Sequence, residues 1–246
     1  MNLVVDIGNS FIKVAVVEQD DVLIVRRFSS VEELQQSSIM EEFPQLQRAI
    51  VASTSITTDG VAEILLGWGL CVLEMTTQTP VPIGNAYHTP STLGVDRLAA
   101  AVGAVEMVGQ DCLIVDFGSA ITIDLVEGGV FKGGNISPGV AMRFRALHDY
   151  TKRLPICEPT DEILEVGCST QSAIVQGVMQ GITNEIEGYI SYFYAKNVKL
   201  SLIFTGGDAK YFVKRIKNAI FANYDLVICG LNRILEYNAR TEKENI

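Results

Sequence analysis

Apolar residues near the start of the chain form three short runs, at 2–7, 12–17 and 22–28, which polar or glycine-containing turns separate. Runs of this length that are rich in β-branched residues are typical of strands. They predict a meander of three strands. The same pattern returns at 112–132, where we therefore expect a second meander.

Helices alternate with further strands after each meander. The expected helices lie at 31–42, 60–67, 95–108, 140–150, 169–195, 208–219 and 230–240. The expected strands lie at 49–52, 70–73, 200–204 and 226–229, with loops at the proline-rich 79–92 and the glycine-rich 133–139. This order, strands first and then alternating helix and strand, indicates a ribonuclease-H-like α/β domain in each half rather than a doubly wound nucleotide fold.

Two segments, at 3–16 and 113–126, are versions of one sequence. LVVDIGNSFIKVAV returns as LIVDFGSAITIDLV, and the constant offset of 110 positions keeps an Asp-x-Gly triplet in register. Two buried strands can resemble each other by chance, but hydrophobicity alone does not align an Asp-Gly pair. The repeat predicts two ribonuclease-H-like domains, residues 1–111 and 112–246, that face each other across a cleft.

Composition narrows the classes of partner. A net charge of −10 over 246 residues argues against nucleic acid or an anionic membrane surface as the main partner. No apolar run approaches the roughly 20 residues that a membrane span needs, and no signal peptide precedes the first strand. The five cysteines form no CxxC pair, which is typical of reduced thiols. We therefore expect a cytoplasmic protein.

Two motifs in the first half carry candidate chemistry. The turn Asp6-Ile7-Gly8-Asn9-Ser10 combines a carboxylate, an amide and a hydroxyl, which together can hold phosphate oxygens and hydrated Mg²⁺. Lys13 interrupts the next apolar strand and is expected either to reach a phosphate or to be a solvated edge lysine. A helix begins at Gly94-Val95-Asp96-Arg97. Asp96 is a candidate general base and Arg97 a candidate anion ligand, although an aspartate in a first helical turn also stabilises the helix dipole.

Two further motifs lie in the second half. Asp116-Phe117-Gly118-Ser119 repeats the acidic turn, and Thr205-Gly206-Gly207-Asp208 follows an apolar strand. Paired glycines at a strand-to-helix junction let a planar ring such as adenine lie against bare backbone, but an ordinary tight turn has the same sequence. Asp124 lies within an apolar strand and is expected either on a solvated face or, less often, in the cleft.

In their order and spacing these motifs resemble the type III pantothenate kinases, which belong to the superfamily of actin, hexokinase and acetate kinase. The resemblance runs over nearly the whole chain, through DIGNS, GVDRLAA, DFGSAITID, GGNISPG, STQSAI and TGGDA. GxDR and GGxIxPG are the specific elements, whereas DxGxS/T and TGG occur across the superfamily. The resemblance implies an actin-like duplication of the domain and the phosphorylation of pantothenate by ATP, the first step of coenzyme A synthesis.

The resemblance also implies a role for each motif. The residues that line the ATP phosphates are Asp6, Ile7, Gly8, Asn9, Ser10, Phe11, Ile12 and Lys13. Further ATP contacts come from Ser119, Gly206 and Gly207. Asp96 takes the proton from the pantothenate hydroxyl. The residues that hold pantothenate beside it are Tyr87, Gly94, Val95, Arg97 and Thr170.

Cations complete the implied site. Asp116 falls where the family holds a monovalent cation, K⁺ or NH₄⁺, beside ATP, and Mg²⁺ accompanies the triphosphate. Phosphoryl transfer asks the protein mainly for positioning and charge compensation. The cations therefore explain how an acidic protein can bind so anionic a ligand.

A homodimer is the last implied feature, because each subunit in the family helps to close the pantothenate pocket of its partner. We expect the cover to come from residues 140–160, where the cations Arg143, Arg145, Lys152 and Arg153 could meet the pantothenate carboxylate. Ala173, Gly177 and Gly181 form a stripe of small residues on the long helix. The stripe serves either this contact or close packing within the subunit.

Two other functions remain as alternatives. Another kinase of the superfamily, acting on a sugar or a short acid, would share the phosphate motifs, but the GVDR segment and Tyr87 argue against it. A non-catalytic nucleotide-binding transcriptional accessory protein would be favoured if Asp6, Asp96 or Asp116 were missing, and all three are present. Pantothenate kinase is therefore the preferred function.

Overall fold

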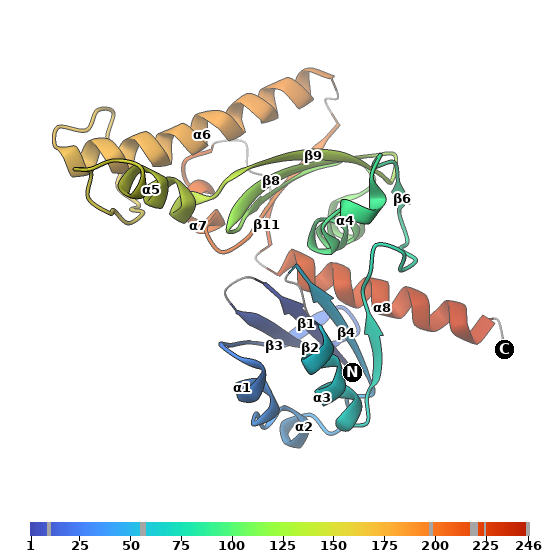
Figure 1. Cartoon of the computed structure of the whole chain (residues 1–246). Helices are drawn as coiled ribbons and strands as arrows, with labels where there is room; N and C mark the ends of the chain where they lie inside the picture. The colour runs from blue at the N-terminus through green and yellow to red at the C-terminus, as the bar shows by residue number, and fades with distance from the viewer. Residues whose placement is uncertain (9–10, 55–57, 197–198, 217–220, 224, 245–246) are drawn as a thin grey trace. The chain divides into compact units, whose positions relative to one another are not determined.

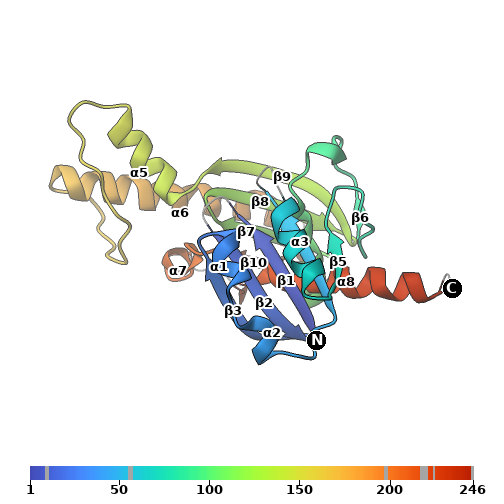
Figure 2. The same ribbon diagram turned by 60° about the horizontal axis from the view of Figure 1, so that its bottom comes forward.

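The computed structural model describes residues 1–8, 11–54, 58–196, 199–216, 221–223 and 225–244. The chain divides into two compact units, and Figures 1 and 2 together label their helices and strands. The first unit consists of Met1–Met107, Gly129–Phe131 and Asp225–Ile246, and the second of Val108–Gly128 and Lys132–Tyr224. The C-terminal residues are thus grouped with the N-terminal half, and the domain boundary between residues 111 and 112 stays a prediction.

Five strands form the sheet of the first unit: β1 (Asn2–Ile7), β2 (Ile12–Glu18), β3 (Asp21–Phe28), β4 (Arg48–Ser53) and β5 (Cys71–Glu74). Their order is β3-β2-β1-β4-β5, with β1 antiparallel to β2 and parallel to β4. The first three strands are the predicted meander, and the later two are added at the other edge by helical crossovers. This is the strand order of a ribonuclease-H-like domain.

The two faces of this sheet contact different helices, because successive side chains of a strand point to opposite faces. One face of β1 shares a core with α1 (Val31–Gln35), α2 (Ile39–Glu42) and α3 (Asp59–Gly67), to which it contributes Leu3, Val5 and Ile7. The other face carries Asn2, whose Nδ2 donates to Asn232 Oδ1 of α8 (Leu226–Glu244) at 2.8 Å. Asp6 shares this second face with Asn2.

The sheet of the second unit repeats the first. Its strands are β7 (Cys112–Phe117), β8 (Ala120–Glu127), β9 (Val130–Pro138), β10 (Ser201–Thr205) and β11 (Phe221–Ala222). With the short strand β6 (Gly84–Asn85) at the edge beside β9, the order is β11-β10-β7-β8-β9-β6, with β7 antiparallel to β8 and parallel to β10. The predicted fold class, α/β with two ribonuclease-H-like domains, is confirmed.

Helices of the second unit pack on this sheet. The long α6 (Thr170–Lys196) buries an apolar side against β7 and β10, and α7 (Ala209–Phe212) contributes Phe212 to the same core. The predicted helix at 140–150 is α5 (Val140–Asp149), which packs against α6, as both views show (Figures 1 and 2).

The hairpins of the two units differ by one residue. Four residues, 8–11, lie between the last paired residues of β1 and β2, but three, 118–120, lie between those of β7 and β8. Val126 therefore occupies the place of Val17, and not of Val16 as a constant offset implied. A shift of one residue exchanges the faces of a strand, so sequence alignment of the two copies misassigns the inward residues of β8.

Residues 226–229 begin helix α8, whereas the sequence pattern predicted a strand there. A short apolar run does not distinguish a strand from a buried helix segment. In α8 the buried side continues through Leu231, Ile234 and Leu235, at helical spacing. The helix packs on β1 and β4, which places it in the first unit.

Other local predictions were also wrong. Residues 133–138 continue β9 and do not form a loop, and the helix predicted at 31–42 is broken into α1 and α2. Over the described residues 208–216, the helix predicted at 208–219 is reduced to α7 followed by turn residues, and its last three residues lie outside the described part of the chain. Within the proline-rich segment, Gly84–Asn85 form the short strand β6, and Pro90–Thr92 form a 3₁₀ helix.

The sequence composition also led to predictions about the cysteines and about membrane spans. All five cysteines are free, two of them buried (Cys112 and Cys157) and two exposed (Cys71 and Cys168). In the part of the chain that the structure describes, no helix combines the length and the apolar character that a bilayer crossing requires.

Candidate functional site

The first acidic motif lies at the end of β1. Asp6 pairs across the hairpin with Lys13 of β2, and the turn is closed where Gly8 N donates to Phe11 O at 3.1 Å. Ile7 and Ile12 form the last pair of the ladder, and both are buried. Asn9 and Ser10 lie outside the described residues. The predicted hairpin is confirmed, and it places a carboxylate and an ammonium side by side.

Burial raises the pKa of Asp6 to about 6, and the negative charge of Asp96 adds to this rise. Lys13 opposes both effects. Asp6 and Asp96 are 90 residues apart in the sequence, yet the fold of the first unit brings them close enough to repel each other. Two carboxylates in such a site are stabilised by a cation or by an added proton.

Lys13 also pairs with a carboxylate that the sequence did not single out. Its Nζ lies 2.7 Å from Asp225 Oδ1, and the lysine side chain is 20% exposed. Asp225 directly precedes α8, and its carbonyl accepts the N–H of Cys229 at 3.0 Å in the first turn of that helix. The reading of Lys13 as a solvated edge lysine is therefore wrong.

The GVDR motif begins helix α4 (Val95–Val108), as predicted. Gly94 precedes it, and a Cβ on this glycine would overlap Asp96 Oδ1. The same oxygen accepts the N–H of Arg97 at 2.8 Å. Burial raises the pKa of Asp96, whereas this backbone hydrogen bond and the charge of Arg97 lower it. Asp96 is thus a desolvated carboxylate whose position depends on a glycine.

Arg97 is buried and packs against two aromatic rings of the first unit. Its Cζ lies 5.7 Å from the ring centroid of Tyr87 and 5.8 Å from that of Phe131. Tyr87 comes from the proline-rich segment and was predicted to line the site, whereas Phe131 was not predicted. The structure brings Tyr87, Val95, Asp96 and Arg97 together in one unit.

The glycine motifs of the second half meet around the Asp116 turn. Gly206 has φ +89°, and a Cβ there would overlap Asp116 Oδ1 and approach Phe117 O to 2.6 Å. Gly139 N donates to Ser119 O at 3.2 Å, and a Cβ on Gly139 would overlap that same oxygen. Gly206 of the TGG motif and Gly139 of the GGNISPG motif are therefore required as glycines by their contact with the DFGS turn.

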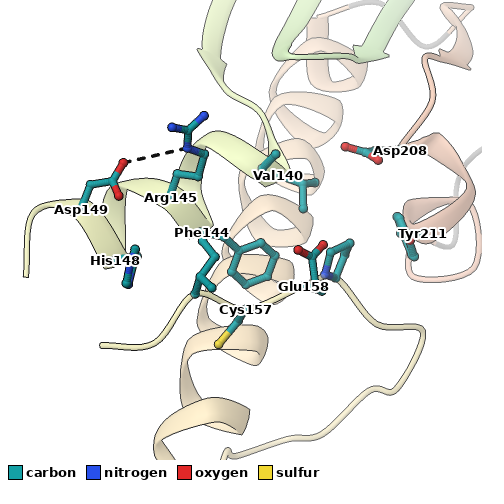
Figure 3. A pocket seen from close by; sticks show the side chains of 12 residues that line it. Val140, Phe144, Arg145, His148, Asp149, Cys157, Glu158, Asp208 and Tyr211 are labelled. Atoms are coloured by element: carbon teal, nitrogen blue, oxygen red, sulfur yellow. Dashed lines mark ion pairs between the residues drawn. The ribbon is translucent and has the colours of Figure 1, made fainter. Parts of the chain in front are cut away.

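A pocket of about 610 Å³ is lined in part by Asp208, whose N–H donates to Phe117 O of this turn at 3.1 Å (Figure 3 shows the pocket). Val140 and Phe144 of α5 line it, and Asp208 and Tyr211 come from the segment that follows TGG. Glu158 adds a second carboxylate from the connection between α5 and α6. Burial raises the pKa of Asp208, and Lys210 opposes this rise. Gly207 precedes these residues, and a Cβ on it would meet nothing within 4 Å.

Asp124 is fully buried on β8, so its expected place on a solvated face is wrong. It faces Gly134 of β9, where a Cβ would overlap its Oδ1. In the predicted match of the two copies, Lys13 corresponds to Ile123. In the structure Thr122 pairs with Asp116 as Lys13 pairs with Asp6. The second acidic turn therefore has a hydroxyl where the first has an ammonium.

Thr170 begins α6 and lines an apolar groove of about 760 Å³ between α5 and α6. Gly177 lies in the same groove, and a Cβ there or on Gly181 would meet nothing within 4 Å. Arg143 borders the groove, where it forms an ion pair with Glu185 and donates to Pro138 O at 2.8 Å. Among the described residues, Gly177 and Gly181 are thus not used for close packing, whereas the backbone of Ala173 lies against Gly167.

The four basic residues that were predicted to help cover the pantothenate pocket of a partner subunit differ in exposure. Arg143 is held by Glu185, whereas the Arg145 side chain is 75% exposed and lies 3.9 Å from Asp149. Lys152 and Arg153 are exposed in the segment after α5. These cations lie in the second unit, and Tyr87 lies in the first.

No group of three or more His, Cys, Asp or Glu side chains that could hold a metal ion occurs among the described residues. A Mg²⁺ ion that accompanies a nucleotide needs only one or two carboxylates, since phosphates and water supply its other ligands. Asp6 and Asp96 fit this requirement, because they are half-buried carboxylates, and the charge of Asp96 raises the pKa of Asp6. Asp116 offers a carboxylate in the second unit.

Some residues of these sites were missed because no local motif marks them. Asp225, Phe131, Glu158 and Tyr211 reach the sites through strand pairing or helix packing of distant segments. The sequence did contain one indication of a carboxylate such as Asp225, namely the position of Lys13 in an apolar strand. A lysine within an apolar strand requires a nearby anion or access to solvent.

Comparison with known proteins identifies the family of this chain. The family model described as type III pantothenate kinase matches residues 2–192. A type III pantothenate kinase from Phocaeicola vulgatus is 40% identical over 240 residues, which cover 97% of this chain and 99% of that protein.

Solved structures show the same fold at low sequence identity. A protein described as a Baf family transcriptional activator from Campylobacter jejuni has a TM-score of 0.63 at 21% identity, over 97% of this chain and 99% of that one. The activator of the 2-hydroxyisocaproyl-CoA dehydratase from Clostridium difficile, with bound ADPNP, has a TM-score of 0.60 at 9% identity and covers 100% of this chain and 97% of that one. At these identities the likeness concerns the fold alone.

Proposed function

The chain belongs to the type III pantothenate kinase family, and we propose that it transfers a phosphoryl group from ATP to the hydroxyl of pantothenate with Asp96 as general base. The observation that carries this proposal is the half-buried, desolvated carboxylate of Asp96 beside Arg97 at the start of α4. Desolvation makes a carboxylate a better proton acceptor, because it raises the pKa toward the working pH.

Substrate positioning in the first unit follows from the same geometry. Arg97 is always charged, and its planar guanidinium suits an anionic substrate group such as the pantothenate carboxylate. Tyr87 lies beside it, and Gly94 leaves room for the Asp96 side chain. The hydroxyl would lose its proton to Asp96 as the phosphoryl group arrives, so that no free alkoxide forms.

ATP phosphates are assigned to the hairpin turn at residues 6–13. The N–H groups of such a turn and the ammonium of Lys13 are donors to phosphate oxygens. Lys13 is already oriented by Asp225 at 2.7 Å. The family implies ATP and a divalent metal as cofactors, and Asp6 is the carboxylate that we propose for the metal side of the triphosphate.

The pocket beside the TGG segment is proposed for the nucleoside. Its Asp208 and Glu158 carboxylates are acceptors for ribose hydroxyls, and the Tyr211 and Phe144 rings offer flat apolar surface for a base. Gly206 and Gly207 let this part of the nucleotide approach the backbone. Asp116 and Ser119 lie at the same turn, where we propose that Asp116 holds K⁺ or NH₄⁺.

A homodimer is proposed as the active form. The support is the open apolar groove between α5 and α6, which Gly177 helps to line, together with two exposed apolar residues, Met142 on α5 and Tyr150 directly after it. Monomeric proteins rarely leave such surface uncovered. A partner subunit that covers it would also bring Thr170 to an interface and exclude water from the reaction.

The test is ADP release measured with and without pantothenate. We expect release that depends on pantothenate, together with a product that carries one phosphate on its hydroxyl. A panel of sugars and short hydroxy acids serves as the control for a different kinase of the superfamily. ADP release that is independent of pantothenate, or faster with a panel member, would refute the proposal.

A further inference from the structure

Arg97 lies in a notch formed by two rings. The distances from its Cζ to the ring centroids of Tyr87 and Phe131 are 5.7 and 5.8 Å, and the two centroids are 6.0 Å apart with an angle of 46° between the ring planes. Arg97 is 7% exposed and Phe131 is 0% exposed. The contact is therefore largely shielded from water, where attraction between a cation and a ring face is strongest.

Strand pairing creates this notch. Gly84 and Asn85 of β6 pair with Val130 and Phe131 of β9, and Ala86 N donates to Phe131 O at 2.9 Å. A Cβ on Gly84 would lie 2.9 Å from Val130 Cγ2, so a glycine lets the two strands approach. The chain then turns, and the ring of Tyr87 comes to lie beside that of Phe131.

We infer that Phe131 is a positioning residue for pantothenate phosphorylation, because its ring holds the Arg97 guanidinium in the orientation that meets the substrate anion. The inference rests on the proposed role of Arg97 as a pantothenate ligand. An arginine side chain has many rotamers, and ordering it on binding would cost affinity. A ring face against the guanidinium limits these rotamers before the substrate arrives.

Phe131→Leu is the first test, because leucine keeps the site apolar but removes the ring face. We expect the KM for pantothenate to rise about 10-fold, while kcat stays within about 3-fold and the KM for ATP within about 2-fold, since the variant changes pre-organisation and leaves Asp96 in place. Phe28→Leu is the matched control. Phe28 is buried in the core of the same unit, so it reports the general cost of the same change.

A fluorinated series separates positioning from simple packing. Fluorine atoms on the Phe131 ring weaken the negative potential of its face and change its volume little. We expect the KM for pantothenate to rise stepwise from one to three fluorines. This series also keeps the inference testable if Phe131→Leu fails to fold. A KM that is unchanged across the series would overturn the inference.

Arg97→Lys distinguishes failure of the inference from failure of the proposed function. If Arg97→Lys raises the KM for pantothenate and the Phe131 variants do not, the positioning role is refuted while the role of Arg97 stands. If Arg97→Lys leaves that KM unchanged, Arg97 is not a pantothenate ligand, and the inference about Phe131 is refuted with it. In the double variant we expect no further rise from Phe131→Leu, because the planar cation that it orients is gone.

Discussion

Gly230 of α8 lies directly against the backbone of Ala99 in α4: a Cβ on Gly230 would overlap the Ala99 carbonyl oxygen. Gly103 lies one turn further along α4, where a Cβ would come within 2.6 Å of Leu226 O. The two helices therefore cross at backbone contact. This crossing holds the helix that carries Asp96 against the helix that follows Asp225, and both belong to the first unit.

Gly230→Ala should destabilise the protein although alanine is the better helix former. The added methyl forces the helices apart, and overpacking of this kind costs about 1–3 kcal/mol. The control is Gly67→Ala at the end of α3, where a Cβ would meet nothing within 4 Å. Urea unfolding of the two variants and the parent checks the prediction, and equal midpoints for both variants would contradict it.

Asp96→Asn should reduce turnover by about 10²–10⁴-fold, because it removes the proton acceptor and keeps the shape of the side chain. Nucleotide binding and the thermal midpoint should change little. Glu106→Gln is the matched control, since Glu106 is an exposed carboxylate on the same helix that contacts Arg233. If Asp96→Asn keeps more than half of the parent rate, Asp96 is not the general base, and its role is to stabilise the start of the helix.

The pKa of Asp6, raised to about 6, predicts a pH dependence of stability in the nucleotide-free protein. Between the unfolded value near 4 and about 6, the folded state binds more protons than the unfolded state. The free energy of unfolding should therefore fall as the pH rises through this window. The contribution of Asp6 is on the order of 2–3 kcal/mol.

Asp6→Asn should flatten this slope, and Asp96→Asn should lower the pKa of Asp6 by removing a neighbouring charge. Urea unfolding between pH 4 and pH 7.5 and carboxyl NMR titration measure the two effects. A slope that is unchanged in Asp6→Asn would show that another group titrates there.

Monovalent cations should control activity through Asp116. Rates should rise steeply when K⁺ or NH₄⁺ replaces Na⁺ at matched ionic strength, and Asp116→Asn should remove the difference. The expected cause is the carboxylate at the turn where Gly206 and Gly118 approach it. Equal rates in the three salts would instead make Asp116 a Mg²⁺-side carboxylate.

Gly177→Trp should block association of subunits, because the indole would fill the groove between α5 and α6. Sedimentation should then show a monomer with a much higher KM for pantothenate. Gly67→Trp places the same side chain at an exposed helix position in the other unit and is the control. A fully active monomer, in the parent or the variant, would exclude composite active sites.

Sequence patterns alone determined the strands, helices and turns whose formation depends on residues that are close together in the chain. The alternation of apolar residues predicted both meanders, and the helical period predicted α4 and α6 nearly to the residue. The Asp-x-Gly repeat located the two hairpin turns, because a tight turn beside a carboxylate restricts which residues fit. Motif order was sufficient to indicate the kinase family.

Tertiary structure decided whatever depends on segments distant in the chain. The run at 226–229 reads equally as strand or helix, and its packing on β1 made it helical. The turn between β7 and β8 is one residue shorter than the turn between β1 and β2, and this difference reverses the face to which each residue of β8 points. The sequence repeat by itself does not reveal the difference. Likewise, Lys13 meets Asp225 and Arg97 meets Phe131 only because sheet pairing and helix packing join them. Such contacts cannot be recognised in a local stretch of sequence. Their stabilising energy comes from the burial of side chains and the approach of charges, and both arise only when distant segments meet in the folded chain.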